Sequence, residues 1–211
     1  NKEFLGWARD EAEVVYVGKQ GGKHTLPQEA INELIVEKAR EGRTVARLKG
    51  GDPYVFGRGG EEAEELVAAG IDFEVVPGVT AGVAAAAYAG IPVTHRAHTT
   101  SVCFITGHED PNKAESGHDW EVYAKSTSTL VFYMGLVGLP LICRELLGAG
   151  RDPATPIALV ERATTPEQRL ITGTLATMPG LVEQAQPQPP TLIIVGAVVG
   201  LARQLGWYGS G

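Results

Sequence analysis

Residues 48–66 read LKGGDPYVFGRGGEEAEEL and place five glycines between an apolar run and an acidic one. The apolar run, residues 44–48, predicts a strand, and the acids from Glu61 to Glu65 predict a helix start, where negative charge is favourable. In open α/β sheets, ligands bind beyond the carboxyl ends of the strands. Because glycine lets a backbone approach a ligand closely, this unit predicts an α/β fold with a binding loop.

Strand and helix candidates follow one another along the rest of the chain. The apolar patterns predict strands at residues 14–17, 44–48, 73–76, 101–106, 130–134, 157–160, 169–172 and 192–195. They predict helices from a capping box at 25–28 to Gly42, from Glu61 to Gly70, and at 81–89, 139–147, 178–184 and 198–205. Strands and helices alternate in the first part of the chain, whereas the second part mixes helix crossovers with strands that are joined directly. We therefore predict two α/β domains, residues 1–97 and 98–211.

The composition is that of an acidic globular protein, 44% hydrophobic, with a net charge of −7. This charge argues against general binding to nucleic acid or anionic membranes, although a local basic pocket remains possible. No apolar run of about 18 residues occurs, so no membrane-spanning helix is expected. Cys103 and Cys143 sit singly in apolar stretches, which argues against a disulfide framework or metal site and favours a reducing cytoplasm.

The loop offers two sets of candidate binding residues. Gly50, Gly51 and Asp52 follow the strand directly, and Asp accepts hydrogen bonds from ligand hydroxyl or amino groups; the alternative is a turn that Asp52 merely caps. Arg58 lies between glycines, where no helix face requires a long cation, so we interpret it as an anion ligand. Glu61 either acts with Arg58 or serves only the helix dipole.

The loop and its surroundings resemble the tetrapyrrole methylase family. The run RLKGGDPYVFGRGGEEAEEL carries the resemblance, with GKQGGKHTLPQEAIN before it and VVPGVTAGVAAAAYAGIPVTHR after it. The resemblance continues through FITGHEDP, TLVFYMG, DPATPIALVERATTPEQRLITGTL and PTLIIVG, and so covers essentially the whole chain. The long form GGDPYVFGRGGEE is similar to the branch that methylates uroporphyrinogen III, whereas GGDP also occurs in other branches.

The resemblance implies an enzyme that uses S-adenosyl-L-methionine. In this family two α/β domains hold the methyl donor in the cleft between them, and the enzymes usually form homodimers. The reaction implied is methylation of uroporphyrinogen III at C2 and then C7, through precorrin-1 to precorrin-2, with release of S-adenosyl-L-homocysteine. The product feeds sirohaem and cobalamin biosynthesis.

The resemblance also assigns site residues by position. The donor site would consist of Gly50, Gly51, Asp52, Val55, Thr80, Ala81, Met134, Ala163, Pro190 and Thr191. Where Ala163 stands the family generally has glycine, and a methyl group there would narrow the pocket. Arg58 and Glu61 match residues thought to bind and process the substrate, and Lys19 matches a lysine assigned as a proton donor. On chemistry alone, Lys19 is equally a cation that binds a substrate carboxylate.

A substrate with several carboxylates requires a local basic surface. The candidates are Arg58, Arg47, Lys49, Arg96 and the histidines beside it, His95 and His98. Arg43 is instead expected on a solvated face that neighbouring acids balance.

One part of the family pattern has no counterpart in this sequence. The family opens with a strand, a G-x-G-P-G-D loop and later an Asp-Arg pair, whose Asp has been assigned as a proton acceptor. The chain begins at Asn1, so we expect that part of the donor pocket and one catalytic residue are missing from it. Two alternatives stay open: a later corrin-ring methyltransferase, which GRGGEE argues against, and a non-catalytic binding module that regulates a fused partner.

Overall fold

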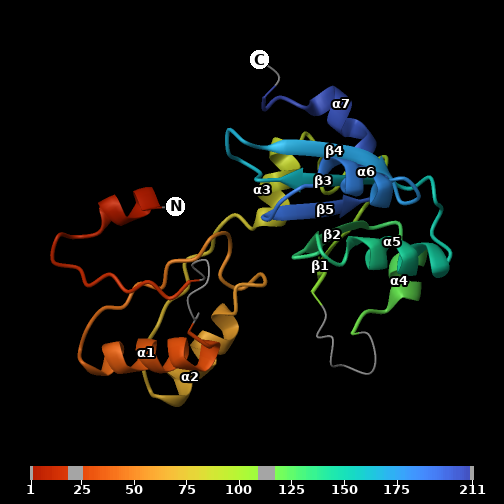
Figure 1. Ribbon diagram of the computed structural model, residues 1–211. Helices are drawn as coiled ribbons and strands as arrows, with labels where there is room; N and C mark the ends of the chain where they lie inside the picture. The colour runs from red at the N-terminus through yellow and green to blue at the C-terminus, as the bar shows by residue number, and fades with distance from the viewer. Residues whose placement is uncertain (1, 19–25, 109–116, 210–211) are drawn as a thin grey trace. The chain divides into compact units, whose positions relative to one another are not determined.

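The structure, a computed structural model, describes residues 2–18, 26–108 and 117–209 (Figure 1). It divides into two compact units: an N-terminal unit, Asn1–Leu48 with Arg58–Val75, and a C-terminal unit, Lys49–Gly57 with Val76–Gly211. The predicted boundary between residues 97 and 98 falls inside the C-terminal unit, because residues 76–97 associate with the C-terminal sheet. Two domains with a cleft between them stay a prediction.

The C-terminal unit contains one mixed sheet in the order β1-β2-β5-β3-β4. β1 is parallel to β2, whereas the pairs β2–β5, β5–β3 and β3–β4 are antiparallel. All five strands predicted in this part of the chain are confirmed. Their bounds are β1 Val102–Thr106, β2 Thr129–Tyr133, β3 Pro156–Glu161, β4 Arg169–Thr174 and β5 Thr191–Val195.

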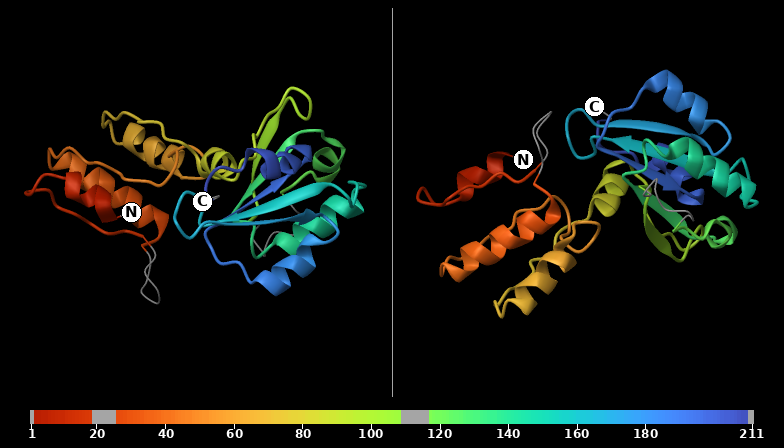
Figure 2. Two further views of the ribbon diagram at one scale, coloured as in Figure 1. Left: turned by 90° about the horizontal axis from the view of Figure 1, so that it is seen from above. Right: turned by 60° about the horizontal axis from the view of Figure 1, so that its bottom comes forward.

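Helices cover both faces of this sheet, as the views in Figure 2 show. On one face, β2 and β5 pack against α3 (Ala81–Tyr88), η2 (Ala197–Leu201) and α7 (Ala202–Leu205). On the other they pack against α4 (Trp120–Lys125), α5 (Leu139–Gly148) and α6 (Met178–Ala185). β2 and β5 are therefore buried on both sides. The predictions missed α4, and the helix predicted at 198–205 begins as a 3-10 helix.

Cys103 and Cys143 are free thiols in the structure. Cys143 lies in α5 within the apolar core, and burial raises the pKa of its thiol to about 11. A thiol with so high a pKa is protonated near neutral pH, so it serves packing and not nucleophilic chemistry.

The N-terminal unit contains η1 (Lys2–Trp7), α1 (Gln28–Arg40) and α2 (Gly59–Ala68). Glu62 of α2 is buried, and one of its carboxylate oxygens accepts hydrogen bonds from Gln28 Nε2 at 3.0 Å and Arg47 Nε at 3.2 Å. These contacts join α1, α2 and the segment before the glycine-rich loop. A buried carboxylate requires such partners because desolvation of the bare charge is costly.

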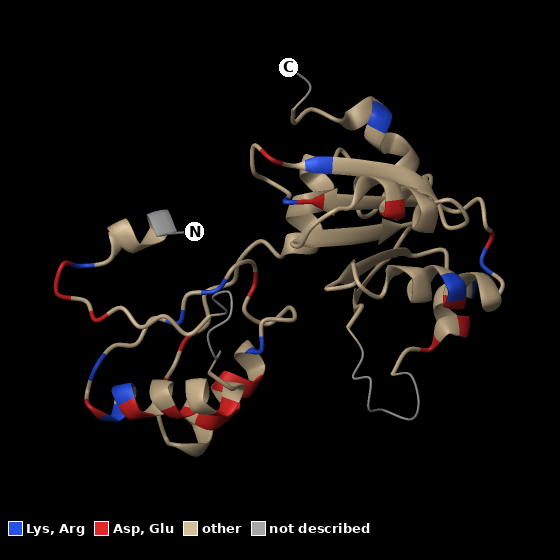
Figure 3. Cartoon of the chain, in the orientation of Figure 1, with Lys and Arg blue, Asp and Glu red and all other residues tan. Residues whose placement is uncertain are grey.

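Acidic residues gather on α1 and α2, whereas the strands carry few charged residues (Figure 3). Each helix in residues 2–18, 26–108 and 117–209 is too short or too polar to span a lipid bilayer.

The strands predicted at 14–17, 44–48 and 73–76 are wrong for this structure. Their backbone forms no ladder with a neighbouring segment. Their apolar side chains are largely exposed, including Tyr16 at 65%, Leu48 at 63% and Val76 at 75%. An apolar run is only a strand when a second strand satisfies its backbone groups, and no described segment of this unit does so.

Candidate functional site

One edge of the C-terminal sheet gathers four of the predicted donor-site residues. β2 and β3 run in the same direction because each is antiparallel to β5, and β1 is parallel to β2. Met134 follows β2, Ala163 lies just beyond β3, and Pro190 and Thr191 lie at the start of β5. The carboxyl ends of β1, β2 and β3 therefore meet the start of β5 at this edge, which is where α/β sheets bind ligands.

Hydrogen bonds fix the segment that precedes β5. Arg162 N–H donates to the Pro190 carbonyl at 2.8 Å, and the Thr191 hydroxyl donates to the Gln188 carbonyl at 2.7 Å. The buried Glu161 carboxylate accepts from Gln188 N–H at 3.1 Å through Oε1 and lies 3.0 Å from Arg169 Nη1 through Oε2. Ala163 and Pro190 are thus held close together by their neighbours.

The first half of the glycine-rich loop, residues 49–57, belongs to the same unit as this edge. Asp52 connects it to a turn 26 positions later: Oδ1 accepts from Tyr54 N–H at 2.8 Å and Oδ2 from Gly78 N–H at 3.1 Å. Both carboxylate oxygens therefore hold the backbone. Val55 packs against the core that α3 shares with the sheet, so its side chain anchors the loop.

The loop and the turn approach each other too closely for side chains. A Cβ on Gly78 would lie 2.4 Å from the Gly51 carbonyl oxygen, and one on Gly57 would lie 2.4 Å from the Pro53 carbonyl oxygen. Gly51 itself has φ of 74° and lies next to the Ala81 amide. Glycine is required at these positions because the backbone segments lie so close together, whereas a side chain at Gly50 would meet only open space.

The turn between residues 77 and 81 connects to the sheet edge through Tyr133, the last residue of β2. The Tyr133 hydroxyl lies 2.7 Å from Thr80 Oγ1 and accepts from Gly82 N–H at 2.8 Å. Thr80 is buried, whereas Ala81 is exposed beside it. The predicted donor residues of three separate segments are therefore brought together in the C-terminal unit.

Strained backbone conformations concentrate in these segments. Non-glycine residues with positive φ include Phe56, Met134, Arg162 and Thr164, at 52°, 56°, 45° and 69°. Such conformations cost on the order of 1–3 kcal/mol each and cluster at ligand-binding sites. Their positions support a binding role for the sheet edge and the loop.

The second half of the glycine-rich loop belongs to the N-terminal unit. Arg58 has φ of 60° and occupies the N-cap position of α2. Its guanidinium pairs with the carboxylate of Glu61, with Nε 2.9 Å from Oε1. Both side chains are about half exposed, at 50% and 51%. The two predicted substrate residues therefore neutralise each other, and an exposed pair of this kind is worth only about 0–1 kcal/mol.

The Arg58–Glu61 pair has a measurable consequence for pH dependence. The hydrogen bond from Arg58 lowers the pKa of the Glu61 carboxyl. Because this pKa is lowered on folding, the pair stabilises the fold above the ordinary Glu pKa and loses that contribution as the pH falls through the lowered value. Carboxyl-carbon NMR titration should give Glu61 a pKa below the ordinary range, and Arg58→Ala should return it to that range. An equally low value in Arg58→Ala would contradict the pairing.

The other predicted cations differ in their availability. Arg47 is committed to Glu62 and to the Leu48 carbonyl, which Nη1 contacts at 2.9 Å, so it does not fit the role of a substrate ligand. Arg96 is exposed in a turn where the rings of His95 and His98 lie 4.8 Å apart. Arg43 pairs with Glu41 and Glu13, as expected for a solvated face. Lys19 lies outside the described residues.

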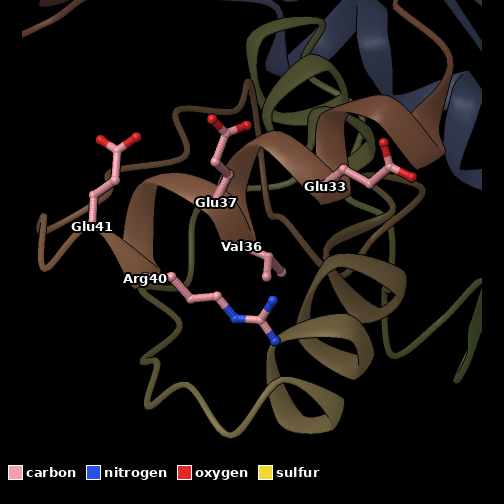
Figure 4. A pocket seen from close by; sticks show the side chains of 5 residues that line it. All are labelled: Glu33, Val36, Glu37, Arg40 and Glu41. Atoms are coloured by element: carbon pink, nitrogen blue, oxygen red, sulfur yellow. The ribbon is translucent and has the colours of Figure 1, made fainter.

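Among the described residues, neither a three-ligand metal cluster nor the depression on α1 offers a rival to the sheet edge. Across residues 2–18, 26–108 and 117–209, no three His, Cys, Asp or Glu side chains could hold a metal ion together. A depression of about 540 Å³ lies on α1, lined by Glu33, Val36, Glu37, Arg40 and Glu41. Figure 4 shows that the three acids extend to one side of α1 and Arg40 to the other, so the depression gathers no converging groups.

Sequence reasoning missed Tyr133, Phe56, Gly78 and Glu161. Tyr133 and Gly78 belong to the recognised motifs YMG and PGVTAG, but nothing local shows which distant groups they contact. Their roles depend on hydrogen bonds and close approaches across 26 to 53 positions.

Comparison with known proteins gives one family. The sequence profile described as Tetrapyrrole (Corrin/Porphyrin) Methylases matches residues 1–179. The siroheme synthase of Thioalkalivibrio sulfidiphilus is 53% identical over 203 residues, which are 96% of this chain and 41% of that protein. The siroheme synthase of Azotobacter vinelandii is 55% identical over 200 residues, 95% of this chain and 43% of that protein. The chain thus spans less than half the length of these curated relatives.

Solved structures of the same kind are also similar. The uroporphyrin-III C-methyl transferase of Thermus thermophilus, complexed with S-adenyl homocysteine, has a TM-score of 0.78 and 38% identity, covering 95% of this chain and 83% of that one. A cobalt precorrin-4 methyltransferase has a TM-score of 0.79 and 26% identity, covering 94% and 80%. Both resemblances extend over nearly the whole chain.

Proposed function

Because this chain belongs to the tetrapyrrole methylase family, we propose that it carries an S-adenosyl-L-methionine-dependent C-methyltransferase activity. The acceptor proposed is uroporphyrinogen III, methylated at C2 and C7 through precorrin-1 to precorrin-2. The observation that carries the proposal is the meeting of the GGD loop, the PGVTAG turn and Met134 through Asp52 and Tyr133. The 38% identical protein that holds S-adenyl homocysteine supports the same donor.

The residues present suit a nucleoside-type methyl donor. The loop and the turn offer glycines whose backbone can lie against a ligand, and Gly50 faces open space. Thr80 supplies a hydroxyl, Asp52 a carboxylate, and Met134 a thioether side chain that is 58% exposed. Such a mixture of backbone groups, one carboxylate and one apolar side chain fits the hydroxyls, amino groups and purine ring of S-adenosyl-L-methionine.

The chain's own residues would bind and orient. The bound donor supplies an activated methyl group, so the protein needs to hold donor and acceptor in line rather than to create a nucleophile. Asp52 would keep the loop against the turn, and the segment around Ala163 and Pro190 would close the side of the donor site. In this proposal the methyl of Ala163 narrows that side.

The acceptor would be held by cations of the N-terminal unit. Arg58 would exchange Glu61 for a substrate carboxylate, which frees the Glu61 carboxylate beside the bound ring. A free carboxylate is suited to accept the proton that the macrocycle must lose after methylation. Lys19 remains a proposal both as a proton donor and as a carboxylate ligand. A second copy of the chain is the proposed partner, which sedimentation of the purified protein would test.

The experiment that tests the function is a methyl-transfer assay. The chain is incubated anaerobically with labelled S-adenosyl-L-methionine and uroporphyrinogen III, and the tetrapyrrole is oxidised and examined for label and red fluorescence. We expect label from two methyl groups per ring, with a reaction without acceptor as the control. Donor binding without transfer would support a non-catalytic module, and transfer only to later corrin precursors would support a different member of the family.

A further inference from the structure

Tyr133 contacts both other segments of the candidate donor site. It is the last residue of β2, is 7% exposed, and directly precedes Met134. Its hydroxyl lies 2.7 Å from Thr80 Oγ1 and 2.8 Å from the Gly82 amide nitrogen, at positions 53 and 51 residues away in the sequence. Both contacts are buried, so water does not replace them if the hydroxyl is removed.

The ring of Tyr133 makes the third connection. It lies 4.8 Å from the ring of Phe56, which is part of the glycine-rich loop and has φ of 52°. The Tyr133 ring also packs edge-on against Phe104 of β1, with the two ring centroids 5.8 Å apart. One side chain therefore contacts residues of the loop, the turn at the start of α3 and the central sheet.

We propose that Tyr133 is a positioning residue for the methyl donor, whose hydroxyl fixes Thr80 and the start of α3 relative to the edge of β2. This inference rests on the proposed function. A Cβ at Gly82 would lie 2.5 Å from the Tyr133 oxygen, so the close approach also requires glycine at that position. The side chain itself is not placed against the reacting atoms, and its effect is on the donor.

Proton accounting shows how the hydroxyl would act. Gly82 N–H donates to the Tyr133 oxygen, which leaves the phenolic hydrogen to donate to Thr80 Oγ1. In that arrangement the hydrogen of the Thr80 hydroxyl is left to donate to an acceptor on the ligand. In the opposite arrangement the Thr80 hydroxyl donates this hydrogen to the Tyr133 oxygen. A bound donor with an acceptor atom at Thr80 selects the first arrangement.

Tyr133→Phe tests the inference because it removes the hydroxyl and keeps the ring. At a temperature well below the melting transition, we expect calorimetry to show about tenfold weaker binding of S-adenosyl-L-homocysteine. In the transfer assay, the KM for the donor should rise by a similar factor, with kcat and the KM for the acceptor nearly unchanged. A role in stability alone would lower the melting temperature without this separation.

Tyr123→Phe is the matched control. Tyr123 lies in α4 and packs against the opposite face of the same sheet. Loss of its hydroxyl should leave donor affinity unchanged. Thr80→Val provides a second route to the same contact, and it remains available if Tyr133→Phe does not fold. Because the two groups share one hydrogen bond, the losses of donor affinity in the double variant should be less than additive.

Amide hydrogen exchange at Gly82 tests the Tyr133 hydrogen bond independently of the donor, and donor binding then separates the inference from the proposed function. Exchange should be faster in Tyr133→Phe whether or not the donor binds, because the amide loses its acceptor. If the unaltered chain binds no S-adenosyl-L-homocysteine, both the proposed function and the inference fail. If it binds and Tyr133→Phe binds equally well, or if the Tyr133 and Thr80 losses are additive, the inference fails and the proposed function stands.

Discussion

Arg58→Ala should abolish formation of the dimethylated tetrapyrrole and leave binding of S-adenosyl-L-homocysteine nearly unchanged. Arg58 belongs to the N-terminal unit, and Glu61 is its ion-pair partner, whereas the proposed donor segments belong to the C-terminal unit. Each charged hydrogen bond to a substrate carboxylate is worth roughly 1.5–3 kcal/mol, so a lost bidentate contact lowers kcat/KM by at least ~100-fold. The transfer assay and calorimetry measure the two effects separately.

Arg43→Ala is a suitable control for this prediction. Arg43 is also an exposed arginine of the N-terminal unit, 55% accessible and paired with Glu41 and Glu13. Its removal should change neither activity nor donor affinity, since exposed pairs contribute little to stability. If Arg58→Ala weakens donor binding as much as it weakens turnover, its assignment to the substrate is wrong.

Asp52→Ala is expected to reduce donor affinity by at least about 100-fold. The substitution leaves the Tyr54 and Gly78 amides without their carboxylate acceptor, and it releases the loop from the turn that carries Thr80. Two hydrogen bonds to a charged group at roughly 1.5–3 kcal/mol each set the scale of the loss. The donor also loses any contact of its own with the carboxylate. Calorimetry with S-adenosyl-L-homocysteine provides the measurement.

The chain contains a close structural match for Asp52 away from the site. Asp152 also precedes a proline, and its Oδ1 accepts from the amide of Ala154 at 2.8 Å, as Asp52 accepts from Tyr54. Asp152→Ala should therefore remove the same local turn and leave donor affinity intact. Gly78→Ala, whose Cβ would meet the Gly51 carbonyl, should reproduce the loss without changing any charge. Unchanged affinity in Asp52→Ala would remove this residue from the donor site.

The elements of the C-terminal sheet could be predicted because their sequence signals are local. The runs TLVFY and TLIIV are continuous apolar segments, and the structure buries each of them on both faces. The three strands predicted nearer the N-terminus have similar apolar runs and still form no ladder. A strand depends on a partner, and an apolar run carries no information about whether a partner segment is present beside it.

The sequence by itself determined the family, the strands of the C-terminal sheet and the motifs that follow them, because short-range apolar patterns and glycine spacing specify these features. Only the tertiary structure decided that the loop divides, with residues up to Gly57 in one unit and Arg58 in the other. It also decided that Asp52 holds Gly78 and that Tyr133 holds Thr80. The physical reason is that these hydrogen bonds join groups 26 and 53 positions apart in the sequence. Which distant groups meet depends on how the chain folds, and the strand order β1-β2-β5-β3-β4 does not follow the chain.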